Sequence, residues 1–283
     1  MRLVALIAAA VTLAPSTVLA QAQPNQPGPA MTAPVDEVLT RPADYKLVWA
    51  DEFDKAGLPD PKKWAYDTHA NKTGWYNKEQ QYYSADRLEN ARVEGGRLII
   101  EARRETLSDR ADHGGQRYSS ARLITKGKAE WAYGFFEIRA KLPCGKGSWP
   151  AIWMLGAIAG WPDGGEIDIM EHVGKTPGDV FGTIHNRSTV GTYGKGSQVR
   201  VPDACEAFHD YQLVWTPDTI SLAVDGKPYH RYTNDKTGSA QWPFDKPQYL
   251  LLNLAIGGAM GGEVDDTIFP ARFEIEHVRV YRR

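Results

Sequence analysis

The chain has 283 residues, enough for one all-β or α/β domain with a large buried core. Its formal net charge of −2 argues against a basic nucleic-acid-binding surface. It contains two cysteines and seven histidines, and none of them cluster at the spacing of zinc ligands, which excludes the common zinc modules.

The N-terminus has the pattern of a secretory signal peptide. Arg2 precedes an apolar run from Leu3 to Leu13, and small residues lead to Ala20. The run is too short to span a bilayer comfortably, and no cysteine near the cut could carry a lipid. We therefore predict a signal peptide at residues 1–20. The protein should be secreted, extracellular or periplasmic, with no membrane association after cleavage.

Residues 21–43 are rich in Pro, Gln, Ala and Thr and lack hydrophobic periodicity, so we predict a flexible linker. The folded domain is predicted to cover residues 44–283. Nothing in the sequence requires an assembly larger than a monomer.

Alternation of apolar and polar residues, which is typical of strands, dominates the predicted domain. It is clearest in three segments bounded by turn residues, at 97–102, 135–142 and 220–224. Asp225-Gly226 then predicts a hairpin turn. Residues 249–256 are apolar on both faces, as expected of a covered strand.

The apolar positions change phase between Ile275 and Val278, which predicts a bulge in the last strand. Sustained helical periodicity is nearly absent, and the best helical candidate is a short one at residues 77–84. Many strands joined by Gly- and Pro-rich turns predict an all-β fold, a two-sheet antiparallel β-sandwich. A sandwich of this size bends, so one concave face should form a substrate cleft.

One strand carries three carboxylates within six residues. Glu166 and Asp168 are two residues apart and should point to one side, whereas Ile167 and Ile169 should point to the core. Like charges raise one another's pKa values, which suits a paired acid and nucleophile better than a structural strand. The pattern alone leaves hydrolysis, a calcium site and a solvated acidic edge as alternatives.

Glu171 has the opposite parity to Glu166, so a regular strand would place the two on opposite faces. One extra residue in a bulge near Ile169-Met170 would return Glu171 to the carboxylate face. Double displacement at a sugar requires this arrangement, with the two carboxyl groups roughly 5 Å apart.

Cys144 and Cys205 are predicted to form a disulfide because exported proteins mature in an oxidising compartment; two buried free thiols are the alternative. The chain also has nine Trp and thirteen Tyr, whose rings suit stacking on sugars as well as core packing.

Three segments around the acidic strand carry a family resemblance: Trp149-Pro150-Ala151-Ile152-Trp153-Met154-Leu155, Gly160-Trp161-Pro162 and Gly165-Glu166-Ile167-Asp168-Ile169-Met170-Glu171. With residues 49–53, 118–123, 252–258 and 278–281, they closely resemble glycoside hydrolase family sixteen, in its laminarinase branch. The resemblance covers nearly all of residues 45–283. It implies a concanavalin-like jelly roll and a retaining endo-β-1,3-glucanase that binds β-glucan polysaccharide or oligosaccharide.

The resemblance implies that Glu166 is the nucleophile, Glu171 the general acid and base, and Asp168 the assisting carboxylate. Catalysis would need no cofactor. The lichenase branch resembles E-x-D-x-E, which is one residue shorter, so the extra Met170 favours the laminarinase type.

Other matching positions suggest substrate contacts, namely Asn77, Arg122, Trp149, Trp153, Trp161 and His185. Each has an ordinary alternative: a turn cap for the asparagine, a salt bridge for the arginine, core packing for the aromatic rings and the histidine.

Many relatives carry a structural calcium ion away from the chemistry, and the matching positions are Glu52, the Gly96 carbonyl and Glu276. The last is a glutamate where aspartate is expected, which puts the metal in doubt.

Three alternatives to a β-1,3-glucanase remain: a mixed-linkage β-1,3-1,4-glucanase, an agar or carrageenan hydrolase, and a noncatalytic glucan-binding lectin. All three carboxylates are present, which argues against the lectin because binding needs no acid and nucleophile. Linkage preference should depend on the loops at 157–163 and 188–197.

Overall fold

The computed structural model describes residues 38–192 and 194–283, so the predicted signal peptide and the linker up to residue 37 lie outside the described residues. In the rest of the linker, Leu39 is buried, and its backbone N–H donates to the Gly226 carbonyl at 2.7 Å. The Arg41 guanidinium lies 4.8 Å from the centre of the Tyr281 ring. The part of the chain that packs against the domain therefore begins a few residues before the predicted boundary at Asp44. No helix in the described part is long and apolar enough to cross a membrane.

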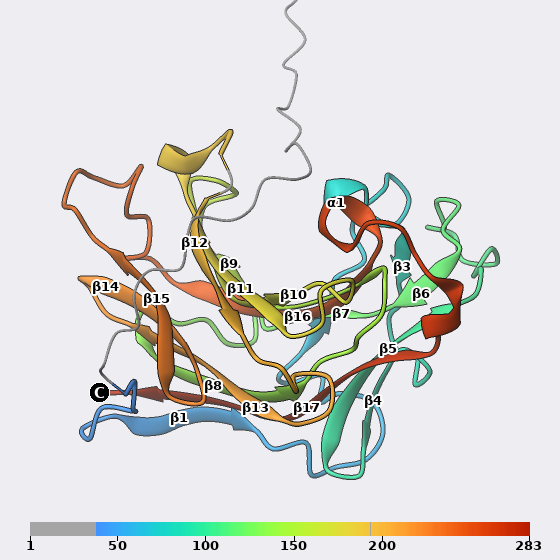
Figure 1. Ribbon diagram of the computed structural model, residues 1–283, viewed down its shortest axis with the longest axis horizontal. Coiled ribbons are helices and arrows are strands. Elements are labelled where there is room, and N and C mark those ends of the chain that lie inside the picture. The colour runs from blue at the N-terminus through green and yellow to red at the C-terminus, as the bar shows by residue number, and fades with distance from the viewer. Residues whose placement is uncertain (1–37, 193) are drawn as a thin grey trace, which may run out of the picture.

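Two β-sheets pack face to face (Figure 1). The larger has ten strands, with a path in the order β15-β14-β13-β8-β17-β5-β6-β3 and with β1 on β17 and β4 on β5. Its strands are β1 (Lys46–Asp51), β3 (Gln81–Tyr83), β4 (Ala91–Glu94), β5 (Arg97–Arg104), β6 (Tyr118–Ser120), β8 (Gly134–Lys141), β13 (His209–Trp215), β14 (Thr219–Val224), β15 (Lys227–Thr233) and β17 (Ala271–Arg282).

The smaller sheet has seven strands in the order β12-β11-β10-β9-β16-β7-β2. Its strands are β2 (Ala65–Tyr66), β7 (Arg122–Ile124), β9 (Ser148–Gly156), β10 (Glu166–His172), β11 (Asp179–His185), β12 (Lys195–Arg200) and β16 (Gln248–Ile256). All strand pairs are antiparallel except β3 with β6. The all-β sandwich predicted from the alternation is confirmed.

The core fills the space between the sheets. Residues such as Ile167 on β10, Phe136 on β8 and Trp215 on β13 are fully buried there. Strand β16 is buried at all nine positions, as its two apolar faces predicted.

The hairpin turn predicted at Asp225-Gly226 joins β14 to β15. Asp225 has φ 49° and Gly226 has φ 75°, the paired positive values that a two-residue hairpin requires. The bulge predicted near Ile275 is also present, because the register of β17 against β8 shifts between Ile275 and His277.

The helix predicted at residues 77–84 is wrong. A 3₁₀ turn covers only Tyr76–Lys78, and the chain then enters β3 at Gln81. Asn77 and Lys78 have φ 55° and 60°, a left-handed conformation that cannot continue a right-handed helix. The other short helices are 3₁₀ turns at Arg187–Thr189 and Asp266–Ile268 and the α-helix α1 at Gly258–Gly261.

Cys144 and Cys205 form a disulfide in the structure, with their Cα atoms 5.8 Å apart. It joins the loop after β8 to the loop that follows β12, 61 residues later in the chain. The cross-link therefore connects the two sheets. It lies near the end of β10 that carries Glu171, because Gly145, next to Cys144, donates its N–H to the carbonyl of Gly174, just after β10.

Candidate active site

Strand β10 contains a bulge at the position predicted from residue parity. Against β9, Asp168 pairs with Trp153 and Met170 pairs with Ile152, so Ile169 is the extra residue. Against β11 the register shifts between Asp168 and Glu171. Ile169 and Met170 both point into the core. Two successive inward residues restore the parity, and Glu171 returns to the face that carries Glu166 and Asp168.

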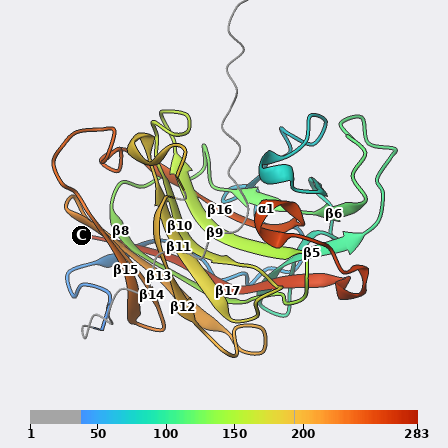
Figure 2. The ribbon, with the colours of Figure 1, turned by 45° about the horizontal axis from the view of Figure 1, so that its top comes forward.

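Strands β9, β10 and β11 lie side by side (Figure 2), and the three carboxyl groups sit on the outward face of this part of the sheet. Glu166 and Glu171 are half-buried, and Asp168 is only 3% exposed. Carboxyl oxygens of Glu166 and Asp168 and a ring nitrogen of His185 all lie within 4.8 Å of one another.

Burial and mutual repulsion hold protons on this cluster. Burial raises the pKa of Glu166 well above its usual range, and the Asp168 charge adds to the shift. Burial and the Glu171 charge likewise raise the pKa of Asp168. Burial also raises the pKa of Glu171, while His185 and the Trp149 indole oppose the shift. The raised pKa values favour keeping a transferable proton on the cluster, as the acid of an acid and nucleophile pair requires.

His185 lies on β11 directly across from Glu166, and its Nε2 is 3.3 Å from an Asp168 carboxyl oxygen. His185 therefore lies beside the carboxylate cluster, where its ring can fix the orientation of Asp168.

Trp149 and Trp153 lie on β9 and are tied to polar groups. The Trp149 indole N–H donates to a Glu171 carboxyl oxygen at 3.0 Å, and its ring is 6% exposed. The Trp153 indole N–H donates to the Asn253 side-chain oxygen at 2.7 Å on β16. Trp149 therefore contacts the carboxylate itself, and Trp153 belongs to a neighbouring hydrogen-bond network.

That network leads to a fourth carboxyl group, which the sequence analysis missed. The Asn253 amide donates to the Tyr83 hydroxyl at 2.9 Å, and this hydroxyl is 3.4 Å from a Glu79 carboxyl oxygen. Burial raises the pKa of Glu79, and Glu171 contributes further. Glu79 and Gln81 both fall within the segment for which a helix was predicted. Because this segment leads into β3 instead, the helical prediction gave no reason to place Glu79 near the other carboxyl groups.

Arg122 on β7 is buried, and its guanidinium lies between two indoles, 5.1 Å from the ring centre of Trp75 and 4.8 Å from that of Trp153. Its Nε is 3.0 Å from an Asp67 carboxyl oxygen. The arginine thus stiffens the Trp153 ring and holds a salt bridge at the same time.

The other two candidate contacts lie on loops. Asn77 is exposed in the 3₁₀ turn before β3. Trp161 is 54% exposed and lines a small hollow with Tyr249 and Lys126 beside the 157–163 loop. The exposed indole is available for stacking. The second predicted loop is shorter than expected, since β12 begins at Lys195.

Of the positions predicted to hold calcium, the two glutamates do not fit that ion. Both carboxyl oxygens of Glu52 accept hydrogen bonds from Arg279, each at 2.8 Å. Glu276 accepts from Arg139 at 2.8 Å and lies 3.8 Å from Arg97. Arginine cations therefore occupy the positions at which a calcium site needs free carboxylates.

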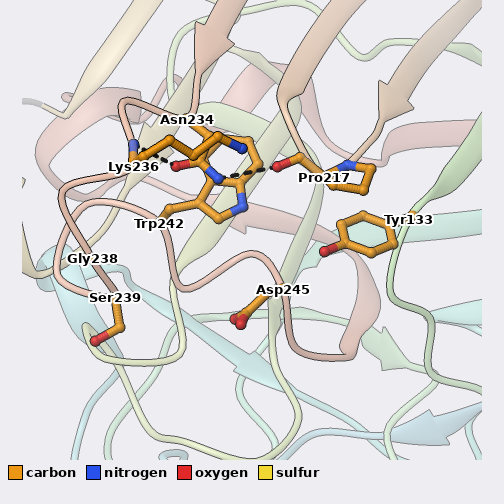
Figure 3. Close-up of a pocket in the computed structure, with 8 residues that line it drawn as sticks. All are labelled: Tyr133, Pro217, Asn234, Lys236, Gly238, Ser239, Trp242 and Asp245. Carbon is orange, nitrogen blue, oxygen red and sulfur yellow. Dashed lines mark hydrogen bonds between the residues drawn. The ribbon is translucent and has the colours of Figure 1, made fainter.

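A separate hollow of about 390 Å³ lies beside Tyr133, Trp242 and Asp245 (Figure 3). Its lining comes from the 234–245 loop and from the segments around Tyr133 and Pro217. None of the carboxylates on β10 lines it, so this hollow is distinct from the candidate active site.

Comparison with known proteins identifies the family. A family model described as glycosyl hydrolases family 16 matches residues 69–274. The chain belongs to glycoside hydrolase family 16. The matched span contains β10 with its bulge and the other strands of the carboxylate face, β9, β11, β16 and β7.

Two relatives and one solved structure match this enzyme over most of their length. A beta-glucanase from Rhodothermus marinus is 51% identical over 253 residues, covering 84% of this chain and 85% of the relative. A glucan endo-1,3-beta-glucosidase from Cryptopygus antarcticus is 38% identical, covering 83% and 91%. Among solved structures, a non-specific endo-β-1,3(4)-glucanase is 54% identical with a TM-score of 0.86, covering 89% of this chain and 96% of that one.

Proposed function

We propose that the chain is a retaining endo-β-1,3-glucanase. The observation that carries this proposal is the bulge in β10, which gathers Glu166, Asp168 and Glu171 on one face of the sheet. Retention by double displacement needs two carboxyl groups about 5 Å apart that flank the scissile bond, one as nucleophile and one as acid.

In the first step the Glu166 carboxylate attacks the anomeric carbon, and the bond to the leaving oxygen breaks. Glu171 gives its proton to that oxygen, so the released chain end leaves as an alcohol. In the second step Glu171 takes a proton from water, the hydroxide attacks the anomeric carbon, and the ester bond to Glu166 breaks. The product keeps the β configuration.

Asp168 assists by position and charge. It lies beside Glu166, and its charge raises the pKa of that carboxyl group. The Glu171 charge in turn raises the pKa of Asp168, so Asp168 can exchange a proton with the nucleophile as the charge on the site changes during turnover. None of these steps requires a cofactor.

The substrate class follows from the relatives. The name of the Cryptopygus relative specifies β-1,3-glucan, and one solved variant of the non-specific glucanase holds a 1,3-β-D-cellobiosyl-glucose at its active site. The similarity to this non-specific glucanase, at 54% identity, makes mixed-linkage β-1,3-1,4-glucan the second candidate substrate. One more distant relative is a keratan-sulfate endo-1,4-beta-galactosidase and another a β-1,3-glucan-binding protein.

The test is hydrolysis of laminarin, barley mixed-linkage glucan, agarose and carrageenan, with the products sized by chromatography. We expect short laminarin oligosaccharides of mixed length, and slower or equal cleavage of the barley glucan. Intact laminarin together with a cleaved galactan would contradict the proposal. Binding of laminarin without any cleavage would support a lectin instead.

Trp149 offers a test of the acid. Its indole N–H stabilises the ionised form of Glu171, so Trp149→Phe should raise the pKa of that carboxyl. Activity is lost as pH rises through the pKa of a general acid, so the alkaline limb of the kcat/KM profile should move to higher pH. Trp153→Phe removes an indole N–H that donates to Asn253 instead, and it should leave that limb in place.

We further propose that the enzyme is a secreted monomer. The signal-peptide pattern at residues 1–20 and a disulfide between Cys144 and Cys205 both favour an oxidising compartment. Expression of the whole chain should give a mature form that starts near residue 21 in the medium or periplasm, and gel filtration should give one chain per particle.

A further inference from the structure

The catalytic bulge is held from the opposite sheet by one buried tyrosine. Tyr229 lies on β15, in the ten-stranded sheet, and its hydroxyl donates to the backbone carbonyl of Ile169 at 2.9 Å. Ile169 is the extra residue of the bulge in β10. The hydrogen bond therefore crosses the sandwich and ends on the backbone between Asp168 and Glu171.

Tyr229 reaches this carbonyl because it sits in a bulge of its own. Against β14, His230 pairs with Leu222 and Pro228 pairs with Ala223, which leaves Tyr229 as the extra residue of β15. An extra residue is displaced from the ladder and re-aims its side chain. Two bulges in opposite sheets thus face one another and are joined through a single hydroxyl group.

Gly182 on β11 makes room for the contact. A Cβ atom at this position would lie 2.3 Å from the Tyr229 hydroxyl oxygen and 2.5 Å from a Leu222 methyl carbon. Both distances are shorter than van der Waals contact allows. The strand next to the bulge therefore lacks a side chain at the point where the tyrosine passes.

The hydroxyl is a permanent donor. Tyr229 is only 8% exposed, and burial holds its pKa far above the usual range, so the proton stays on the oxygen throughout the working pH range. A displaced carbonyl in a bulge has lost its regular ladder partner, and leaving it unpaired in the core would be costly. The tyrosine supplies the missing partner.

We propose that Tyr229 is a positioning residue for the hydrolytic reaction, which fixes the bulge and with it the spacing between Asp168 and Glu171. This inference rests on the roles proposed above for the carboxylates. Tyr229 touches no substrate in this arrangement, because its side chain lies within the core on the far side of β10 from the carboxyl groups.

The experiment compares Tyr229→Phe with Tyr211→Phe. Tyr211 is a matched control, since it is a fully buried core tyrosine whose hydroxyl has no hydrogen-bond partner among the described residues. Each substitution removes one oxygen atom and keeps the ring. Both proteins are assayed on laminarin at a temperature where circular dichroism shows them fully folded.

We expect Tyr229→Phe to lower kcat about tenfold with KM changed less than about twofold, because a misplaced acid affects the chemical step more than binding. The limbs of its pH profile should also shift. Tyr211→Phe should keep kcat within about twofold of the wild type and leave the profile unchanged. Equal kinetic constants and pH profiles in the two variants would overturn the proposal.

A second measurement does not depend on turnover. Carbon-13 labelling of the glutamate carboxyl groups allows Glu166 and Glu171 to be titrated by NMR. Their pKa values should move in Tyr229→Phe and stay in place in Tyr211→Phe, and no shift in the former would contradict the inference. If the wild type cleaves none of the glucans, the proposed function fails. If it cleaves laminarin and the two variants behave alike, only the role of Tyr229 fails.

Discussion

Glu166→Gln and Glu171→Gln should each lower kcat on laminarin by about 10³-fold or more. Each substitution removes the charge or the proton on which one step of the double displacement depends, while keeping the size of the side chain. Steady-state release of reducing ends measures the loss. Full activity in either variant would refute the assigned roles.

Azide distinguishes the two roles. With Glu166 truncated to glycine, azide should displace the leaving group directly and give an α-glycosyl azide. With Glu171 truncated to alanine and an aryl glycoside as substrate, the ester to Glu166 still forms, and azide should open it to a β-glycosyl azide. The opposite pairing of anomers would exchange the two assignments.

The same glutamine variant of Glu166 should also be more stable than the wild type at neutral pH, which shows that its inactivity is not unfolding. The folded-state pKa of Glu166 is raised, so the wild type loses stability as pH rises above the usual glutamate pKa of about 4.3. Glutamine has no such loss, and we expect a gain of roughly 1 kcal/mol that disappears below about pH 4. Thermal melts at several pH values measure it.

Trp215→Ala should lower the free energy of unfolding by about 4 kcal/mol. The Trp215 side chain is fully buried at the end of β13, and its indole N–H donates to the Phe244 carbonyl at 3.0 Å. Truncation leaves a cavity and an unpaired carbonyl together.

Denaturant titration measures this loss, with Trp161→Ala as the control. Trp161 is 54% exposed, so its removal should change the free energy of unfolding by less than about 0.5 kcal/mol. An equal effect at the two tryptophans would mean that the burial described for Trp215 is wrong.

Several strands were predictable because their side chains obey a local rule. Period-two alternation predicted β8 and β14, and the Asp225-Gly226 dipeptide predicted the hairpin between β14 and β15, where both residues have positive φ. The order of strands within each sheet was beyond reach, since it depends on contacts between distant segments such as β16 with β7.

The candidate site divides in the same way. The parity of Glu166 and Glu171 predicted the bulge, because parity is a property of neighbouring residues. The helix at 77–84 failed since Asn77 adopts a positive φ that no local pattern announced. Glu79 and Tyr229 were missed because each acquires its role only through partners elsewhere in the chain.

The bulge also divides the catalytic strand into two independently adjustable parts. From Glu166 to Asp168 the ladder against β11 is regular, so the distance from nucleophile to assisting carboxylate is a fixed property of the pleat. The irregular step lies entirely between Asp168 and Glu171. A change in length or packing there would move the acid without disturbing the nucleophile or His185. Evolution or engineering can therefore change the position of the proton donor, Glu171, without moving the nucleophile, Glu166.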